Sequence, residues 1–191
     1  MSELNILLIC QLGMGLFWII TYILVIYKGW RDKQYGMPMA AICANISWEF
    51  IFAFIYPQND LQRYITLIWF LLDIVILMQF LRYAPNEYRR MFSKKLLYLS
   101  FLLTLIFSML TILGLVHEFH DYEGKYAAFF QNLMMSGLFI ALLLQRGNLA
   151  GQSMAIAICK MLGTLFAVAT LFYDWLYILL IYRLQRKKTK L

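Results

Sequence analysis

Apolar residues fill stretches of this chain that are long enough to cross a membrane, and short polar segments separate one stretch from the next. An α-helix needs about 20 mostly apolar residues to cross the hydrocarbon core of a bilayer, and the stretches lack the alternation of membrane β-barrel strands. Pro38 suits the first turn of the second helix, Pro57 ends that helix, and Pro85 is expected to open the polar segment after the third. The pattern predicts five helices, over residues 4–27, 37–56, 63–83, 96–116 and 126–144.

The C-terminal part of the chain is assigned from its charges. Residues 154–182 are mostly apolar, a stretch longer than one span needs and shorter than two comfortable ones. Lys and Arg are in excess in segments 28–36 and 84–95 and in the tail from Arg183, which places all three on the cytoplasmic side. Arg146 marks a further cytoplasmic loop, so the chain must cross twice before the tail. We therefore predict a sixth helix at 147–164 and a seventh at 166–183, with the N-terminus outside and the C-terminus in the cytoplasm.

The composition excludes a soluble domain. Hydrophobic residues make up 63% of the 191 residues, charged residues make up 14%, and the mean hydropathy is +0.69. The net charge of +7 lies in the loops and the tail, where it meets lipid headgroups, so we expect no nucleic-acid partner. The first apolar stretch has no basic leader and is predicted to be a retained helix. The prediction is one all-α domain over residues 1–191, a polytopic seven-helix bundle in the cell inner membrane or the endoplasmic reticulum, depending on the organism.

Three acidic residues fall inside the predicted helices. Glu49 lies roughly 18 Å along its helix from Met37, Asp174 lies roughly 14 Å before the start of the basic tail, and Asp73 is near the middle of the third helix. All three are therefore expected near the middle of the membrane. A carboxylate at that depth is costly unless it faces a protein interior or a wet cavity, so each is a candidate functional group. Lys160 is the mid-segment cation, and we expect it to reach the membrane surface from near a helix end.

Polar and aromatic residues share helix faces with these acids. Asn45 lies one turn before Glu49, and we expect it to orient the carboxyl group. Burial disfavours the charged form of a carboxyl, so at least one acid is expected to be protonated at neutral pH. A protonated acid that faces aromatic rings suits chemistry with a carbocation, because the acid starts it and the ring faces stabilise the cation. Candidates for the wall of such a chamber are Trp48, Phe52, Tyr56, Trp69 and Tyr177.

The residues alone leave other functions open. The same chamber would serve a proton-coupled small-molecule carrier or sensor, with the acids as its proton sites. An assembly factor with no small-molecule site would instead have the acids paired off and the helices packed shut. Asp73 is either a third catalytic group or a structural hydrogen-bond acceptor, and the structural role is favoured because intramembrane acids often pair with polar partners. Most of the aromatic residues have a packing or anchoring alternative as well.

Four short motifs occur in order along the chain. The first two are the run Asn45 to Glu49 (NISWE) and the segment from Trp69 to Asp73 (WFLLD). The others are Gly151-Gln152-Ser153 followed by Lys160 and Gly163, and the segment from Asp174 to Tyr177 (DWLY). In their order and spacing, from about Met37 to Tyr182, the chain resembles one known family, the small integral-membrane terpene cyclases of the paxilline and pyripyropene type, with bacterial relatives.

The resemblance implies a seven-helix, metal-independent cyclase, an isomerase or lyase that needs no cofactor. It implies that Glu49 and Asp174 are catalytic acids that protonate the terminal epoxide or alkene of a linear prenyl chain on a lipid-like terpenoid or meroterpenoid substrate. A cyclisation cascade ended by proton loss would follow. The sequence has no aspartate-rich DDxxD motif for binding a diphosphate, which fits this mode of initiation. Supporting or substrate-binding roles are assigned to Asn45, Trp48, Phe52, Trp69, Asp73 and Tyr177.

Two polar segments have plainer alternatives. Asn148 and the segment 151–153 are candidates for a substrate head-group site at the cytoplasmic mouth, or for a simple helix N-cap with permissive glycines. His117, Glu118, His120 and Asp121 include the residue types of a metal site. They lie in a short outer loop, so we expect a solvated loop and no metal.

Overall fold

The computed structural model of the chain describes residues 3–91, 93–165, 179–183 and 186. Within these residues the secondary structure is entirely helical, which confirms the predicted all-α class. Residues 179–183 are also helical. The labelled α-helices of the described residues are α1 (Glu3–Asp32), α2 (Met39–Phe50), α3 (Asp60–Glu87), α4 (Lys94–Phe119), α5 (Lys125–Arg146) and α6 (Met154–Thr164).

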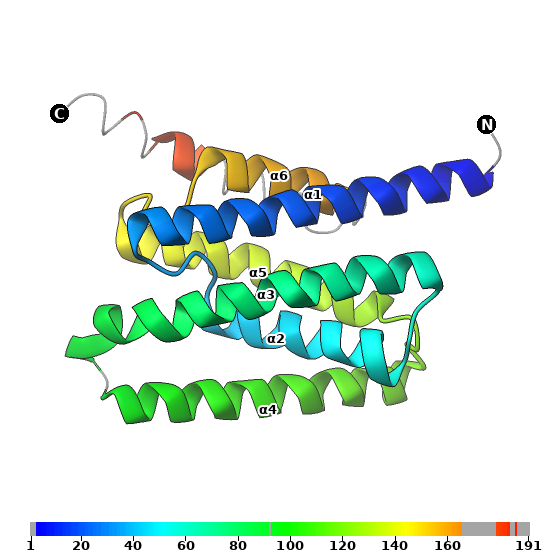
Figure 1. The fold of residues 1–191 in the computed structure, drawn as a ribbon, viewed down its shortest axis with the longest axis horizontal. Coiled ribbons are helices and arrows are strands. Elements are labelled where there is room, and N and C mark those ends of the chain that lie inside the picture. Colours follow the sequence, from blue (N-terminus) through cyan, green and yellow to red (C-terminus); the bar gives the residue numbers. More distant parts are fainter. Residues whose placement is uncertain (1–2, 92, 166–178, 184–185, 187–191) are drawn as a thin grey trace.

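The helices lie nearly along one direction, and the short helix α2 lies inside the bundle (Figure 1). Helix α2 packs against α3, α4 and α5, while α1 packs against α3 and α6. Eight residues of α2, among them Asn45, Trp48 and Glu49, are buried. The chain therefore places the polar side chains of Asn45 and Glu49 inside the protein.

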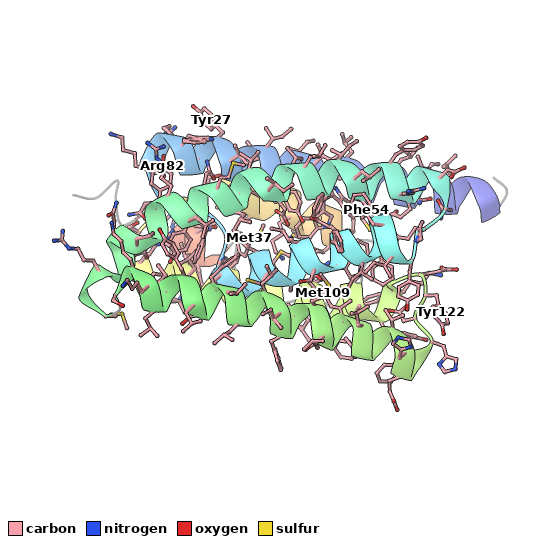
Figure 2. The ribbon with its side chains drawn as sticks, turned by 60° about the horizontal axis from the view of Figure 1, so that its bottom comes forward. Tyr27, Met37, Phe54, Arg82, Met109 and Tyr122 are labelled. Carbon is pink, nitrogen blue, oxygen red and sulfur yellow. The ribbon has the colours of Figure 1, made fainter. Side chains whose placement is uncertain are left out.

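The outer faces of the bundle are apolar. Helices α3, α4 and α5 and the segment Gln11–Asp32 of α1 are each long and apolar enough to cross a membrane. On α4, Phe107 is 70% exposed and Leu110 is 62% exposed, a surface suited to lipid. Figure 2 shows Tyr27 projecting away from α1, whereas Met37 lies between the helices and is fully buried.

Helix α3 continues through Pro85 to Glu87, so the prediction that Pro85 opens a loop is wrong. A proline inside a helix cannot donate to the carbonyl four residues earlier. The Leu81 carbonyl accepts a hydrogen bond of 3.3 Å from the Tyr98 hydroxyl of α4 instead. A partner from the next helix thus replaces the missing bond.

Helix α2 ends in one π-helical turn, Ile51–Ile55, directly after the segment that carries Glu49. The predicted helical stretch over residues 37–56 is thus confirmed to within two residues at each end, and its last turn is π-helical. Irregular turns leave backbone carbonyls without their usual helical donors. Here the Ala53 carbonyl accepts from Arg63 Nε at 3.1 Å, and the Phe52 carbonyl accepts from the backbone N–H of Gln58 at 3.3 Å.

The predicted sixth helix at 147–164 is also wrong in its extent. Residues 147–153 form a loop, and α6 has 11 residues, about 17 Å of rise. Lys160 does not reach the membrane surface: its side chain is fully buried, and Nζ donates to Ser136 Oγ at 2.6 Å. The predicted seventh helix at 166–183 falls mostly on residues outside the described part of the chain.

A buried arginine joins the loops at the end of the bundle where α1, α3 and α5 finish. Arg146 donates to both carboxylate oxygens of Glu87, at 2.9 and 2.7 Å, and to the backbone carbonyls of Tyr35 and Ala150. Its guanidinium also lies 4.3 Å from the centre of the Tyr35 ring. Burial holds the pKa of the Tyr35 hydroxyl well above its usual value, so this hydroxyl stays neutral and bonds to Tyr88.

Candidate active site

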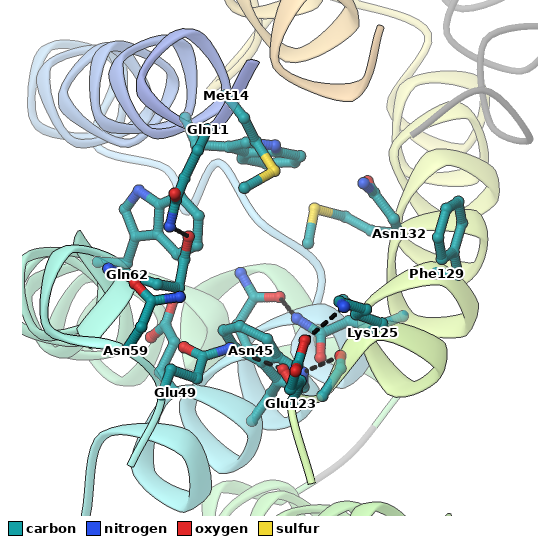
Figure 3. Close-up of a pocket in the computed structure, with 18 of the residues that line it drawn as sticks. Gln11, Met14, Asn45, Glu49, Asn59, Gln62, Glu123, Lys125, Phe129 and Asn132 are labelled. Carbon is teal, nitrogen blue, oxygen red and sulfur yellow. Dashed lines mark hydrogen bonds and ion pairs between the residues drawn. The ribbon is translucent and has the colours of Figure 1, made fainter. Parts of the chain in front are cut away.

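A cavity of about 740 Å³ opens at the end of the bundle where α1 begins. Its walls come from α1, α2, α3 and α5, and the loops before α3 and α5 edge its mouth (Figure 3). The volume is in the range typical of small-molecule sites. Most of its wall consists of aromatic and amide side chains, namely Trp18, Tyr22, Trp48, Trp69, Tyr122, Phe129, Gln11, Asn45, Gln58, Asn59, Gln62, Gln131 and Asn132.

Glu49 is the carboxylic acid in the inner wall of this cavity. Its side chain is 1% exposed, and its Oε1 accepts a hydrogen bond of 3.3 Å from the Tyr22 hydroxyl. The other oxygen, Oε2, has no hydrogen-bond partner among the described residues. Because Oε1 is already an acceptor, a proton on this carboxyl group belongs on Oε2.

A chain of hydrogen bonds leads from α5 to this carboxyl group. Gln131 donates through Nε2 to Asn45 Oδ1, Asn45 donates through Nδ2 to the Tyr22 hydroxyl at 2.6 Å, and Tyr22 donates to Glu49. Every link runs in the same direction, so each group in the chain orients the next. The structure therefore gives Asn45 the expected role, through Tyr22 rather than by a direct bond to the acid.

Asp73 is fully buried on α3 next to Glu49. It does not line the cavity, and its carboxyl group lies beside the side chains of Asn45 and Glu49. Two neighbouring carboxyl groups with little water around them resist joint ionisation. The pair formed by Glu49 and Asp73 is therefore suited to hold a proton, and this pairing is a finding of the structure that the sequence did not predict.

The indole rings of Trp48 and Trp69 form one wall, with their centres 6.5 Å apart. Trp48 Nε1 donates to the Gly124 carbonyl at 3.0 Å, and Trp69 Nε1 donates to the Gly15 carbonyl at 3.4 Å. These bonds fix both rings. A fixed aromatic face attracts a positive charge that forms beside it.

Phe52 is buried but does not line the cavity. Its ring lies 5.0 Å from the ring of Trp48 and supports it from behind. The same ring packs under Gly124, where an added Cβ would come within 2.6 Å of it, and the φ angle of +75° at Gly124 also favours glycine. The prediction that Phe52 belongs to the chamber wall is thus replaced by a supporting role.

The structure brings together four of the predicted site residues in the wall, Asn45, Trp48, Glu49 and Trp69. Asp174 and Tyr177 lie outside the described residues. Sequence analysis missed Trp18 and Tyr22, which line the cavity from α1. Their spacing of four residues puts them on one helix face, but nothing in the sequence alone points that face toward Glu49.

The polar segment before α6 provides the helix N-cap that was one of its two predicted roles. Ser153 caps α6 by accepting from the backbone N–H of Ile156, and Gln152 donates to the Gly36 carbonyl. This segment is remote from the cavity, which opens at the other end of the bundle. Glu123 and Lys125, an exposed ion pair, edge the mouth instead.

Comparison with known proteins finds relatives of one kind. The family described as Pyr4-like transmembrane terpene cyclases matches residues 2–184. The Pyr4-family terpene cyclase mfmH of Annulohypoxylon moriforme is 33% identical over 176 residues, which cover 90% of this chain and 70% of the relative. The terpene cyclase penB of Penicillium crustosum is 31% identical over 170 residues, 87% of this chain and 70% of the relative. No solved structure matches the chain.

Proposed function

The chain belongs to the Pyr4-like transmembrane terpene cyclases, and from this premise we propose that it closes a linear prenyl chain in the cavity with a proton from Glu49. The observation that carries the proposal is the buried carboxyl pair of Glu49 and Asp73, of which Glu49 lines a cavity that Trp48 and Trp69 also line. General acids act through such a positioned, protonated group.

The reaction that this geometry supports starts at the terminal epoxide or alkene of the prenyl chain. Glu49 Oε2 gives its proton to the epoxide oxygen, or to the terminal alkene carbon, and positive charge develops on the neighbouring carbon. Internal double bonds attack in turn, and the rings of Trp18, Trp48 and Trp69 stabilise the moving charge. Loss of a proton from carbon ends the cascade. The product is therefore an isomer of the substrate, and the balance of atoms requires no cofactor.

The remaining acids have different proposed roles. Asp73 shares the proton with Glu49 and positions it, because it neighbours that carboxyl group without lining the cavity. Asp174, with Tyr177 one turn later, is proposed as the second catalytic acid on the strength of its motif in the predicted last helix. Both residues belong to the helix expected at 166–183.

We propose seven membrane-spanning helices in a single domain, with the N-terminus outside and the C-terminus in the cytoplasm. The basic segments 28–36 and 84–95 and Arg146 then lie on the cytoplasmic side, where such residues are enriched. The cavity, at the end where α1 begins, opens away from the cytoplasm. A lipid-like prenylated substrate would enter it from the membrane or from that face.

The experiment is the incubation of membranes that contain the protein with a panel of prenylated phenols and indoles, each with a terminal alkene or a terminal epoxide. The proposal predicts a cyclic product with the mass of the substrate, identified by mass spectrometry and nuclear magnetic resonance. Membranes from cells with the empty vector are the control. If the protein moves a panel member into sealed vesicles without changing its covalent structure, the proposal is refuted.

A further inference from the structure

A glycine of α6 packs directly against a ring in the cavity wall. Gly163 is buried near the end of α6, and a Cβ added to it would lie 2.8 Å from Cδ1 and 2.9 Å from Nε1 of Trp18. Carbon atoms in ordinary contact are about 3.5–4 Å apart. Glycine is among the poorest helix-forming residues, and this close packing accounts for its presence inside α6. A side chain at position 163 therefore has to displace either the Trp18 ring or the helix.

The surroundings of Trp18 favour movement of its ring toward the cavity. Tyr22, one turn later on α1, lies edge-on to the ring, with 5.8 Å between the centres. Lys160 Nζ of α6 lies 5.7 Å from the ring centre, and its hydrogen bond to Ser136 Oγ holds it there. The cavity provides empty space, because Trp18 lines it. Helix α6 is kept in place by its packing along α1, so the indole is the part that moves.

Trp18 lies well inside the cavity. The mouth is at the end of the bundle where α1 begins, and the lining residues of α1 follow one another inward as Gln11, Met14, Trp18 and Tyr22. Trp18 is seven residues beyond Gln11, about 10 Å further along the helix axis. The next residue in this row, Tyr22, bonds to Glu49. The Trp18 ring therefore limits the space that a prenyl chain has between the mouth and the acid.

We infer that the contact between Gly163 and Trp18 sets the length of the prenyl chain that the cavity accepts. This inference rests on the proposed function and adds how the size of the substrate chain is selected. Trp18 faces the substrate and is the specificity-determining residue. Gly163 acts through Trp18 as a positioning residue, because its missing side chain lets the ring lie back against α6. The prenyl chain folds in the space that the ring leaves free.

The test compares substrates that differ only in chain length. The probes are phenols that carry a prenyl chain of two, three or four isoprene units, each with the terminal alkene or epoxide that the wild type converts best. The variants are Gly163→Ala, Trp18→Phe and the double variant. Gly137→Ala is the matched control, because a Cβ added to this glycine of α5 meets nothing within 4 Å and the residue does not line the cavity. The value of kcat/KM is measured for each chain length in membranes that contain equal amounts of protein.

The expected shift follows from the size of the change. One methylene too many in a hydrophobic pocket changes kcat/KM by about ten-fold or more, and the methyl group added in Gly163→Ala displaces the ring by a comparable amount. We therefore expect Gly163→Ala to shift the preference about ten-fold toward the shorter chain. Trp18→Phe has a smaller ring and is expected to shift it toward the longer chain. Gly137→Ala is expected to keep the preference of the wild type.

The double variant shows whether the effect passes through the ring. The smaller ring of Trp18→Phe gives the methyl group of Gly163→Ala room on the α6 side. The preference of the double variant is therefore expected to return to within about three-fold of the wild type, a strong coupling between two residues in contact. A purely structural role of Gly163 would lower the stability without moving this preference.

Several results would overturn the inference and leave the proposed function standing. One is a Gly163→Ala protein with the preference of the wild type, because α6 would then have moved instead of the ring. Another is a double variant that keeps the full shift of Gly163→Ala. If Gly163→Ala does not fold, as thermal unfolding in detergent shows, Trp18→Phe decides alone, and an unchanged preference refutes the inference. If the wild-type protein converts no chain of any length, the proposed function fails, and this inference fails with it.

Discussion

Replacing Tyr22 by phenylalanine tests whether the hydrogen-bond chain prepares Glu49 for proton transfer. The variant keeps the ring, which packs edge-on against Trp18 with 5.8 Å between the centres. It removes the hydroxyl that donates to Glu49 Oε1 at 3.3 Å and accepts from Asn45 Nδ2 at 2.6 Å. The change therefore removes the hydrogen bond to the Glu49 carboxyl group and leaves the wall of the cavity in place.

The magnitude follows from the groups that lose a partner. A buried polar group that loses its partner costs about 1–3 kcal/mol, and each 1.36 kcal/mol added to the activation barrier is a factor of ten in rate. If one such loss of about 2 kcal/mol is felt in the transition state, kcat falls about 30-fold. We expect KM to change less than two-fold. The hydroxyl precedes Glu49 in the hydrogen-bond chain, and the ring that lines the cavity is unchanged.

The assay is cyclisation of the best prenyl substrate by membranes with known amounts of each variant, with kcat and KM fitted separately. Tyr27→Phe is the matched control, because Tyr27 is on the same helix and is 59% exposed on the outer face. Thermal unfolding in detergent shows whether Tyr22→Phe remains folded. A folded Tyr22→Phe protein with the kcat of the wild type would refute the proposed chain.

Three further predictions concern other parts of the protein. Trp48→Phe loses the hydrogen bond to the Gly124 carbonyl, which holds the ring in place. We therefore expect kcat to fall about ten-fold and the products to include by-products of cascades that stop early. An unchanged product profile would contradict this. Arg146→Lys loses the paired bonds to Glu87, which should lower the stability by about 2 kcal/mol, measured as a lower unfolding temperature in detergent with KM unchanged. Asp174→Asn should lower kcat by about 100-fold or more if this residue is the second acid, and a rate within two-fold of the wild type would remove it from the site.

The helical class and the burial of Glu49 and Asp73 inside the helices that carry them could be predicted because they depend on local signals. Apolar length and charged loops determine where each helix crosses the membrane, and distance along a helix then gives the depth of each acid. Asn45 follows from the spacing on one helix face. These are properties of single helices, and the sequence records them directly.

The errors arise where two helices interact. Pro85 stays inside α3 because Tyr98, on the next helix, supplies a donor for the carbonyl that the proline leaves free. Lys160 is buried because Ser136 of α5 accepts its hydrogen bond. The roles of Tyr22 and Gln131 could not be predicted for the same reason, because they depend on hydrogen bonds to Glu49 and Asn45 across helix interfaces. Periodicity along one helix does not contain these partners.

The most direct measurement for the central claim is the single-turnover rate of Glu49→Gln with a substrate that the wild type cyclises, together with its dissociation constant. Glutamine keeps the shape of the side chain but supplies no carboxylic proton. We predict a rate at least about 100-fold below that of the wild type, with substrate binding within about two-fold, while the matched variant Glu118→Gln, at an exposed position of α4 outside the cavity, keeps full activity. A folded Glu49→Gln protein that cyclises the substrate at the rate of the wild type would contradict the account.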